Sequence, residues 1–322
     1  MKKYLPLLSV LSAFFVLIIA SREVIAGAAD ALILCAQLII PSLFPFFVAS
    51  SMLCRLGLPQ MLSKLLDGVG QKLFRVSGKG FSAFIVGLFG GYPMGASYIA
   101  DMEKSGAVST AEAEKLLAFC SNSGPAFIIG AIGSGIFASP SAGLLLYLIH
   151  ILSAVMTGIV FRGKNGGRST GDTGISEPPP SGSFSEIFTD CVKSAVTSVL
   201  SVCGFVIVFA VMTGLLTSSG LLGLIASVIS RVTGLSVSYA SALLSGLFEL
   251  GSGIGRMRGM PLDLKSFALA AGIMGFGSVS VCFQTSAVLS GTKIKGALYL
   301  PGRLVCSVFS VVLSLILGGL IF

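Results

Sequence analysis

Seven apolar stretches constrain the fold of this chain more than any other feature. They cover residues 4–20, 24–54, 116–138, 140–161, 190–216, 267–290 and 296–322. Most approach or exceed the roughly 20 residues with which a helix crosses about 30 Å of hydrocarbon. Only 11% of the residues are charged, 54% are hydrophobic and the mean hydropathy is +0.97, which is unlike a soluble domain. The sequence therefore predicts an all-α, polytopic membrane protein with the lipid bilayer around it.

The basic residues give a formal net charge of +8, but they stand in short segments between the apolar stretches. This placement is typical of the positive-inside rule and does not favour a nucleic-acid partner. The seven cysteines form no CxxC and no metal-ligand spacing, and no hydrolase, metalloprotease or nucleotide-binding motif is present. We therefore expect neither an enzyme nor a cofactor or metal site.

A Gly-Gly-Tyr-Pro sequence interrupts an apolar segment within the motif GLFGGYPMGASYIADMEKSG, residues 87–106. Glycine weakens helices, and proline lacks a donor and clashes with the preceding turn. Non-helical backbone at membrane depth is tolerated only where protein buries it or where it lines a water-filled cavity. The break therefore predicts a binding site. Pro93 is expected in the first turn of a returning half-helix, whose free N–H groups suit a carboxylate or phosphate.

The chain contains two similar halves. The Gly-Leu-Phe triplets at 87–89 and 246–248 lie 159 residues apart, and AFCSNSGPAFIIG (118–130) is matched by GFGSVSVCFQTSAVLSG (275–291). A stretch rich in Gly, Ser, Pro and charge, residues 162–183, indicates a flexible cytoplasmic linker between them. We predict a first membrane repeat over residues 1–161, which begins with a transmembrane helix at 4–20, and a second, inverted membrane repeat over 184–322.

The distribution of Lys and Arg decides whether the interrupted segments cross the membrane. If residues 80–105 and 236–260 are re-entrant hairpins and the N-terminus is cytoplasmic, the cytoplasmic face holds 16 of the 21 basic residues; if each segment crosses once, the split is 11 to 10. The positive-inside rule therefore favours two inverted repeats, each with a re-entrant helical hairpin and a broken transmembrane helix. The sixteen are Lys2, Lys3, Arg55, Lys64, Lys72, Arg75, Lys79, Lys104, Lys115, Arg162, Lys164, Arg168, Lys193, Lys293, Lys295 and Arg303.

Three smaller features complete the organisation. The apolar stretch at 4–20 is followed so soon by the next one that a retained helix is favoured over a signal peptide cleaved from residues 1–26. Pro41 and Pro45 lie in an apolar run of 31 residues, too long for one straight span, and predict a break or sharp kink there. His150 is the single histidine, and a packed, hydrogen-bonded role is favoured over a proton relay.

Polar residues at the breaks form the candidate site. Glu249 is expected near the tip of the second hairpin as a coupling group for a proton or cation; a wet vestibule or an ion pair with Arg256 or Arg258 is the alternative. Arg256 could contact a carboxylate at two points, with interfacial anchoring as its alternative role. The other candidates for substrate binding are Gly91, Tyr92, Pro93, Ser121, Asn122 and Ser123 in the first half, and Gly251, Ser252, Ser278, Ser280 and Gln284 in the second. Hydrogen bonding between helices is the alternative role of these polar groups.

A resemblance to a known family extends over most of the chain. It is carried by the segments PSLFPFFVASSMLCRLG, GLFGGYPMGASYIADMEKSG and LLAFCSNSGPAFIIG, and by the repeat after the linker. The chain resembles the sporulation integral membrane proteins with nucleoside-recognition Gate domains, and within these the spore dipicolinate transporter family. The resemblance implies an architecture similar to concentrative nucleoside transporters, with inverted repeats, re-entrant hairpins and alternating access. It also implies that dipicolinate is the substrate, moved from the mother cell across the outer forespore membrane.

The leading hypothesis is a transporter for a small anionic solute, with dipicolinate implied by the resemblance. A nucleoside-type carrier and a non-transporting scaffold for spore maturation are the alternatives. The expected partners are a small-molecule anion and the lipid bilayer, and a homo-oligomer and a coupling proton or cation remain open. We expect a multi-pass protein of the bacterial cell membrane.

Overall fold

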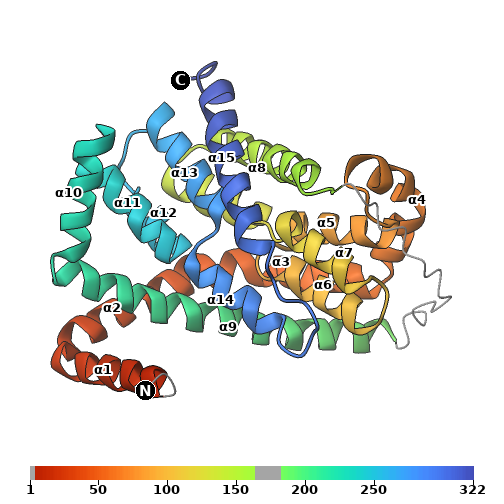
Figure 1. Ribbon diagram of the computed structural model, residues 1–322, viewed down its shortest axis with the longest axis horizontal. Helices are drawn as coiled ribbons and strands as arrows, with labels where there is room; N and C mark the ends of the chain where they lie inside the picture. The colour runs from red at the N-terminus through yellow and green to blue at the C-terminus, as the bar shows by residue number, and fades with distance from the viewer. Residues whose placement is uncertain (1–3, 164–182) are drawn as a thin grey trace.

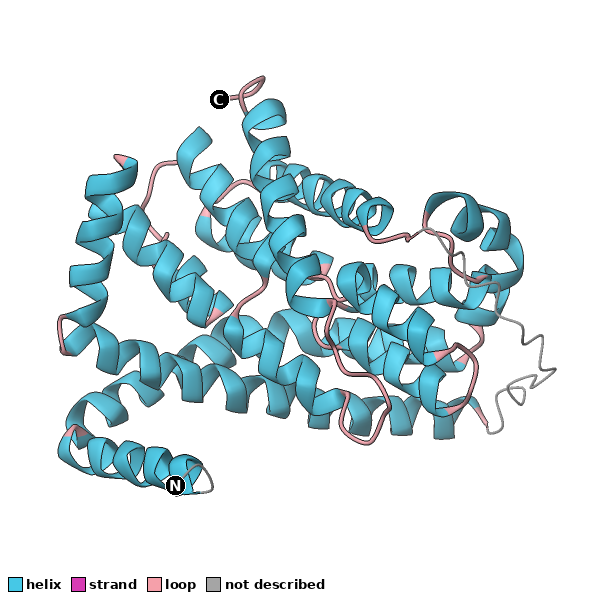
Figure 2. Ribbon diagram, in the orientation of Figure 1, coloured by secondary structure: helices cyan, strands magenta, loops and turns pink. Residues whose placement is uncertain are grey.

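A computed structural model describes residues 4–163 and 183–322, and every regular element in these two ranges is a helix (Figure 2). The first half contains α1 (Leu5–Ile19), α2 (Ser21–Leu34), the π-helical segment η2 (Cys35–Ile39), α3 (Ile40–Arg55), α4 (Leu58–Leu73), α5 (Gly78–Gly90), α6 (Met94–Lys104), α7 (Thr110–Cys120), the π-helical segment η3 (Ala126–Ile136) and α8 (Pro140–Val160). The second half contains α9 (Phe184–Ser218), α10 (Leu221–Thr233), α11 (Val237–Phe248), α12 (Leu250–Gly255), α13 (Leu264–Phe276), α14 (Val279–Val288) and α15 (Tyr299–Gly318). The linker expected at 162–183 falls almost wholly outside the described residues.

Both halves use the same order of elements. After α1, the first half continues with a helix of 35 residues, Ser21–Arg55, and the second half starts with a helix of the same length, α9. A shorter helix follows, α4 or α10, and the chain then bends by 94° or 119° into a helical hairpin, α5–α6 or α11–α12. An interrupted helix, α7–η3 or α13–α14, leads to a last helix, α8 or α15. These bent pairs fit the re-entrant elements expected from the glycine-rich breaks.

The two halves run in opposite directions. In Figure 1 the first long helix ends at α4 on the right, whereas α9 packs beside it and ends at α10 on the left. The hairpin α5–α6 consequently comes from the right-hand side of the molecule, and the hairpin α11–α12 comes from the left. The tips of the two hairpins meet in the middle, as the inverted-repeat prediction requires.

Among the described residues, five helices are long and apolar enough to cross a bilayer: Ser21–Arg55, Pro140–Val160, Phe184–Ser218, Leu264–Val288 and Tyr299–Gly318. Counting each bent pair as a span raises the number to seven. The prediction of an all-α, polytopic membrane fold is confirmed. Helix α1 is different, because its 15 residues extend only about 22 Å and so fall short of the hydrocarbon thickness.

The prolines of the first long helix do not break it. The helix continues from Ser21 to Arg55, and the π-helical segment Cys35–Ile39 precedes Pro41 directly. A π-helical turn inserts one extra residue without ending the helix. The helix can therefore continue past a proline, which has no backbone N–H to donate. Pro45 lies inside α3 with the helix intact around it. Of the break or sharp kink predicted at Pro41 and Pro45, the break is therefore wrong, and a π-helical segment lies just before Pro41 instead.

The first hairpin packs tightly on the interrupted helix behind it. Gly87 on α5 and Gly95 on α6 both face the carbonyl oxygen of Cys120, so closely that an added Cβ at either glycine would overlap it. Below this contact, Phe74, Phe84 and Phe119 form an aromatic cluster with ring centroids 4.7–5.8 Å apart. Two features hold the hairpin against α7: the two glycines allow close contact with its backbone, and the large aromatic side chains pack against one another.

Candidate functional site

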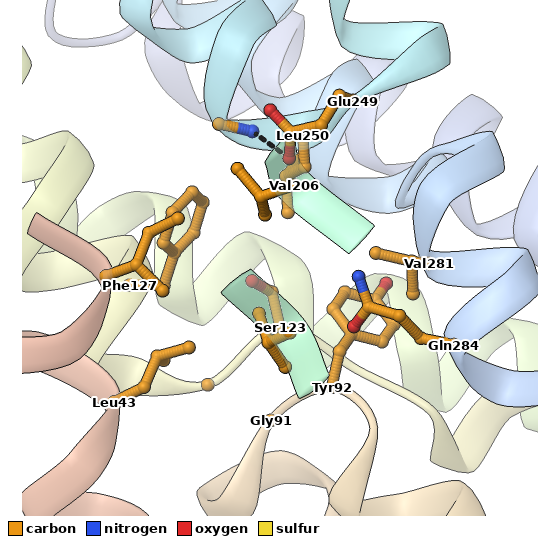
Figure 3. Close-up of a pocket in the computed structure, with 14 residues that line it drawn as sticks. Leu43, Gly91, Tyr92, Ser123, Phe127, Val206, Glu249, Leu250, Val281 and Gln284 are labelled. Carbon is orange, nitrogen blue, oxygen red and sulfur yellow. Dashed lines mark hydrogen bonds between the residues drawn. The ribbon is translucent and has the colours of Figure 1, made fainter. Parts of the chain in front are cut away.

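One small cavity collects residues from all the special elements of both halves (Figure 3). The tips of both hairpins, both interrupted helices and both long helices contribute to its wall. We call it the central cavity; its lining residues are Ile39, Leu43, Gly91, Tyr92, Ser123, Gly124, Phe127, Val202, Val206, Glu249, Leu250, Gly251, Val281 and Gln284. Figure 3 shows Glu249 and Leu250 on one side of it, and Tyr92, Gly91 and Ser123 on the other.

The first hairpin reaches the cavity through Gly91 and Tyr92. Gly91 has a φ of +74°, and an added Cβ would come within 3.0 Å of the amide nitrogen of Gly124. Only glycine fits both the backbone conformation and this close approach. Tyr92 follows, with 8% of its surface exposed, and its hydroxyl donates to the carbonyl of Met274 at 3.5 Å. Pro93 precedes the returning helix α6, as expected, and lies just outside the cavity.

The second hairpin reaches the cavity through Glu249 and Gly251. Glu249 is 3% exposed and caps α12: its carboxylate accepts hydrogen bonds from the backbone N–H of Gly251, at 2.9 Å, and of Ser252. Gly251 and Ser252 were expected to bind the substrate. The protein's own carboxylate occupies their amides, so the two hairpin tips differ in chemistry.

The interrupted helices place polar side chains on both sides. The backbone N–H of Ser123 donates to His150 Nε2 at 3.1 Å, which holds the histidine, 1% exposed, as a packed and hydrogen-bonded group. On the other side Gln284 lines the cavity, and its amide donates to the hydroxyl of Ser280 at 3.3 Å. Ser278 caps α14 by accepting from the N–H of Val281 at 3.1 Å.

Six of the thirteen predicted site residues line the central cavity: Gly91, Tyr92, Ser123, Glu249, Gly251 and Gln284. Six others lie directly beside it on the same elements but are not part of its wall: Pro93, Ser121, Asn122, Ser252, Ser278 and Ser280. Asn122 is fully buried, with its amide donating to the carbonyl of Phe119 at 2.8 Å and its carbonyl oxygen without a partner. These side chains could reach a ligand only if the break rearranged.

Arg256 lies apart from the others. It is exposed at the end of α12, and its guanidinium donates to the hydroxyl of Thr217 at 3.0 Å. Arg258 is exposed as well. The structure does not bring either arginine into the central cavity, and neither pairs with Glu249.

Sequence reasoning missed two parts of the site. The apolar wall comes from Ile39, Leu43, Val202 and Val206 on the long helices, which carry no local signal of a site. The other part is Arg303, which was counted among the basic residues of the cytoplasmic loops. It is 0% exposed in the first turns of α15, so it is a buried helix residue and not a loop residue.

The central cavity is narrow. Its volume of about 50 Å³ has room for a few water molecules. A drug-sized organic ligand needs about 300 Å³ or more. The wall must therefore open before the cavity can take an aromatic solute.

A second, larger cavity of about 640 Å³ is lined by neighbouring residues on several of the same elements. We call it the vestibule; α3, α6 and α9 form most of its wall. On α3, Ile39 and Leu43 line the central cavity and Phe47, Ser51 and Arg55 line the vestibule, in steps of four residues. Residues four apart share a helix face, so one face of α3 follows both spaces. Phe47, 1% exposed, lines the vestibule one helical turn after Leu43 of the central cavity.

Many side chains in the wall of the vestibule are polar. Small hydroxyl residues of α9 line it at helical spacing, and α6 adds further polar side chains. These residues are Ser194, Thr197, Ser198 and Ser201 on α9, and Ser97, Tyr98 and Asp101 on α6. Such a wall suits a water-filled path that leads toward the tip of the first hairpin. In the part of the chain that the structure describes, no group of three or more His, Cys, Asp or Glu residues is placed to hold a metal ion.

Comparisons with known proteins agree with this architecture. No family model matches the chain, and no solved structure matches it. The chain is 29% identical over 306 residues to the sporulation integral membrane protein YlbJ of Bacillus subtilis strain 168, an alignment that covers 87% of this chain and 74% of YlbJ. The chain is thus a polytopic helical membrane protein related to a sporulation integral membrane protein.

Proposed function

We propose that the protein is a transporter that moves a small anionic aromatic solute across a bacterial membrane by alternating access during sporulation. Dipicolinate is the favoured substrate on the resemblance to the spore dipicolinate transporter family. The outer forespore membrane is its favoured location, with the N-terminus in the cytoplasm. The homology to a sporulation integral membrane protein supports the setting, and the architecture supports the mechanism.

The convergence of two oppositely directed hairpins on one cavity carries the proposal. In carriers built from inverted repeats, the substrate lies between the repeats, where discontinuous helices end. The central cavity has this composition, with Gly91 and Tyr92 from one hairpin and Glu249 and Gly251 from the other. A solute held there would touch both halves and could be released by movement of one half against the other.

The combination of vestibule and central cavity supports alternating access. The vestibule is wide and carries many polar side chains, whereas the central cavity is about 50 Å³ and is lined by neighbouring residues of the same helices. A path that is wide at one end and narrow at its centre is the arrangement of a carrier open toward one side. The tip of the first hairpin and Phe47 separate the two spaces, so they are the groups expected to move.

Glu249 supports coupling to a proton or cation. Its carboxylate lies at the second hairpin tip, faces the central cavity and has no basic side chain as a partner among the described residues. A dianionic substrate would be repelled by this charge in a space that excludes water. Binding of a proton or a small cation together with the substrate removes the repulsion, which couples the two movements.

The decisive experiment is uptake of radiolabelled dipicolinate into proteoliposomes that contain the purified chain. We expect uptake in the wild type and its loss in Glu249→Gln, because glutamine keeps an acceptor for the cap of α12 but carries no titratable charge. Glu23→Gln, an exposed carboxylate on α2, is the matched control and is expected to transport normally. Absence of dipicolinate movement in the wild type would contradict the substrate assignment, and absence of movement of nucleosides as well would contradict transport.

The scaffold alternative makes a different prediction. In a spore-forming host, the transport proposal requires spores with reduced dipicolinate when Glu249→Gln or Asn122→Ala replaces the wild-type chain. Normal spores with normal dipicolinate content in both variants would favour a scaffold. A nucleoside-type carrier keeps the architecture, and uptake of labelled nucleosides in preference to dipicolinate would identify it.

A further inference from the structure

Arg303 is the largest fully buried side chain of the described residues, with 0% of its surface exposed. It lies on α15, four residues after the helix begins at Tyr299. An arginine inside a membrane-spanning segment is rare and usually serves a substrate pathway or another charge. The burial of the Arg303 side chain therefore needs an explanation, which its position in the sequence does not provide.

The partners of Arg303 are all neutral. Nη1 donates to the hydroxyl of Tyr92 at 3.0 Å, Nη2 donates to the carbonyl of Ala118 at 3.3 Å, and Nε has no partner. Within the described ranges the ion pair between side chains joins Arg55 and Asp190, and no carboxylate lies within 4 Å of Arg303. Its positive charge is thus buried without a counter-charge, which is costly unless something else compensates it.

The position of Arg303 links it to the central cavity. Tyr92, which accepts its hydrogen bond, forms the tip of the first hairpin and lines that cavity. The same hydroxyl lies beside the interruption of the second half, since a Cβ on Gly277 would come within 3.2 Å of it. Ala118 lies near the end of α7, just before the interruption of the first half. Arg303 therefore stands behind the point where the hairpin tip and both interruptions meet.

We propose that Arg303 and Tyr92 recognise the carboxylate of the transported anion. Tyr92 contacts the ligand, and Arg303 is a positioning residue that supplies the compensating charge through the tyrosine hydroxyl. The hydroxyl now donates to Met274 over a long 3.5 Å bond, so turning it toward a carboxylate in the cavity sacrifices little. This assignment rests on the proposed transport function. It identifies Arg303 as the positive charge that attracts the anionic substrate, a role that exposed Arg256 does not fill.

A purely structural role is the competing explanation. The end of α7 carries the partial negative charge of a helix C-terminus, and Arg303 could serve only to compensate it. The two explanations differ for the variant Arg303→Met, which keeps the bulk and removes the charge. If the charge waits for a ligand, its removal leaves the unfolding temperature unchanged or raises it, because an uncompensated buried charge is lost. If the charge is structural, the unfolding temperature falls.

The test measures binding of radiolabelled dipicolinate by the purified full chain, with competition by its neutral analogue pyridine-2,6-dicarboxamide. We expect Arg303→Met to weaken dipicolinate binding by about 30-fold or more, as is typical of truncating one partner of a buried charge pair. Arg303→Lys should retain part of the preference for the charged ligand, and Tyr92→Phe should lose about tenfold, since one hydrogen bond to a charged group is removed. Arg256→Met is the matched control and is expected to bind like the wild type.

The outcomes separate this inference from the proposed function. A wild-type chain that neither binds nor moves dipicolinate contradicts the proposed function, whatever the variants do. A wild-type chain that binds it, with Arg303→Met binding equally well, contradicts only the role of Arg303. Loss of binding together with a lower unfolding temperature in both Arg303→Met and Arg303→Lys also overturns it. If Arg303→Met does not fold, Tyr92→Phe decides: an unchanged preference for dipicolinate over the diamide refutes the assignment.

Discussion

The tip of the second hairpin depends on a contact between two glycines, and a single methyl group tests it. Gly253 on α12 packs against the backbone of Gly246 on α11, and an added Cβ would overlap that backbone and come within 3.0 Å of the carbonyl oxygen of Ala242. Gly255, two residues later on the same short helix, has no atom within 4 Å of an added Cβ. The variants Gly253→Ala and Gly255→Ala thus make the same chemical change in two different surroundings.

The expected magnitude follows from these distances. The new methyl group of Gly253→Ala would overlap the Cα of Gly246 and lie 2.5 Å from its amide nitrogen, and ordinary contact needs about 3.5 Å, so α11 and α12 must separate by more than about 1 Å. Overpacking of this kind costs about 1–3 kcal/mol, and the better helix propensity of alanine returns at most about 1 kcal/mol. Gly255→Ala gains the better helix propensity of alanine without the cost of overpacking. We therefore expect Gly253→Ala to be less stable than Gly255→Ala by about 1–3 kcal/mol.

Thermal unfolding in detergent provides the measurement. The chain has no tryptophan but several buried cysteines, so a thiol-reactive dye reports unfolding. Each kcal/mol shifts the midpoint by about 2–4 °C in a chain somewhat smaller than this one. Glu249 stands four residues before Gly253, so the same separation should also weaken substrate binding. Equal unfolding temperatures and equal binding in the two variants would refute the described packing of the hairpin.

Three further predictions concern contacts outside this hairpin. His150→Phe leaves the buried amide that now donates to the imidazole without an acceptor, which should cost about 1–3 kcal/mol in the same unfolding assay, whereas His150→Gln should lose less. Glu114 accepts hydrogen bonds from the backbone amides of residues 295–297; Glu114→Gln should speed hydrogen exchange at these amides and leave the middle of α15 unchanged. The ion pair between Arg55 and Asp190 spans 3.3 Å between side chains that are 50% and 54% exposed, so a double-mutant cycle should give less than about 1 kcal/mol, and less again at high salt.

The breaks in the helices could be predicted because their causes are local. The Gly-Gly-Tyr-Pro sequence and the Ser-Asn-Ser-Gly-Pro sequence interrupt apolar segments, and the structure interrupts its helices at both. The rule that proline breaks a helix predicts a break at Pro41 that the structure does not show, because a π-helical segment precedes Pro41 and the helix continues. Whether a proline ends a helix or is accommodated depends on the turn before it, which the sequence pattern does not report.

The rest of the site depends on contacts distant in sequence. Arg303 and Tyr92 are 211 residues apart, and nothing near Arg303 distinguishes it from a loop residue at the start of an apolar stretch. Val202 and Val206 line the cavity only because α9 packs beside the first long helix. Such residues become recognisable only when the two halves are placed together.

Inverted repetition predicts where a site lies, but the chemistry comes from the places where the two halves differ. At one hairpin tip the chain has Tyr92, supported by the buried positive charge of Arg303; at the other it has Glu249, whose carboxylate caps its own half-helix. A solute between these tips meets a cation behind one wall and a carboxylate in the other, so it cannot bind equally in both orientations. An anion would place its charge toward Tyr92, and a proton or cation would go to Glu249. The two halves thus enclose one cavity with a carboxylate in one wall and Tyr92 in the other, and the buried positive charge of Arg303 lies behind Tyr92 without lining the cavity.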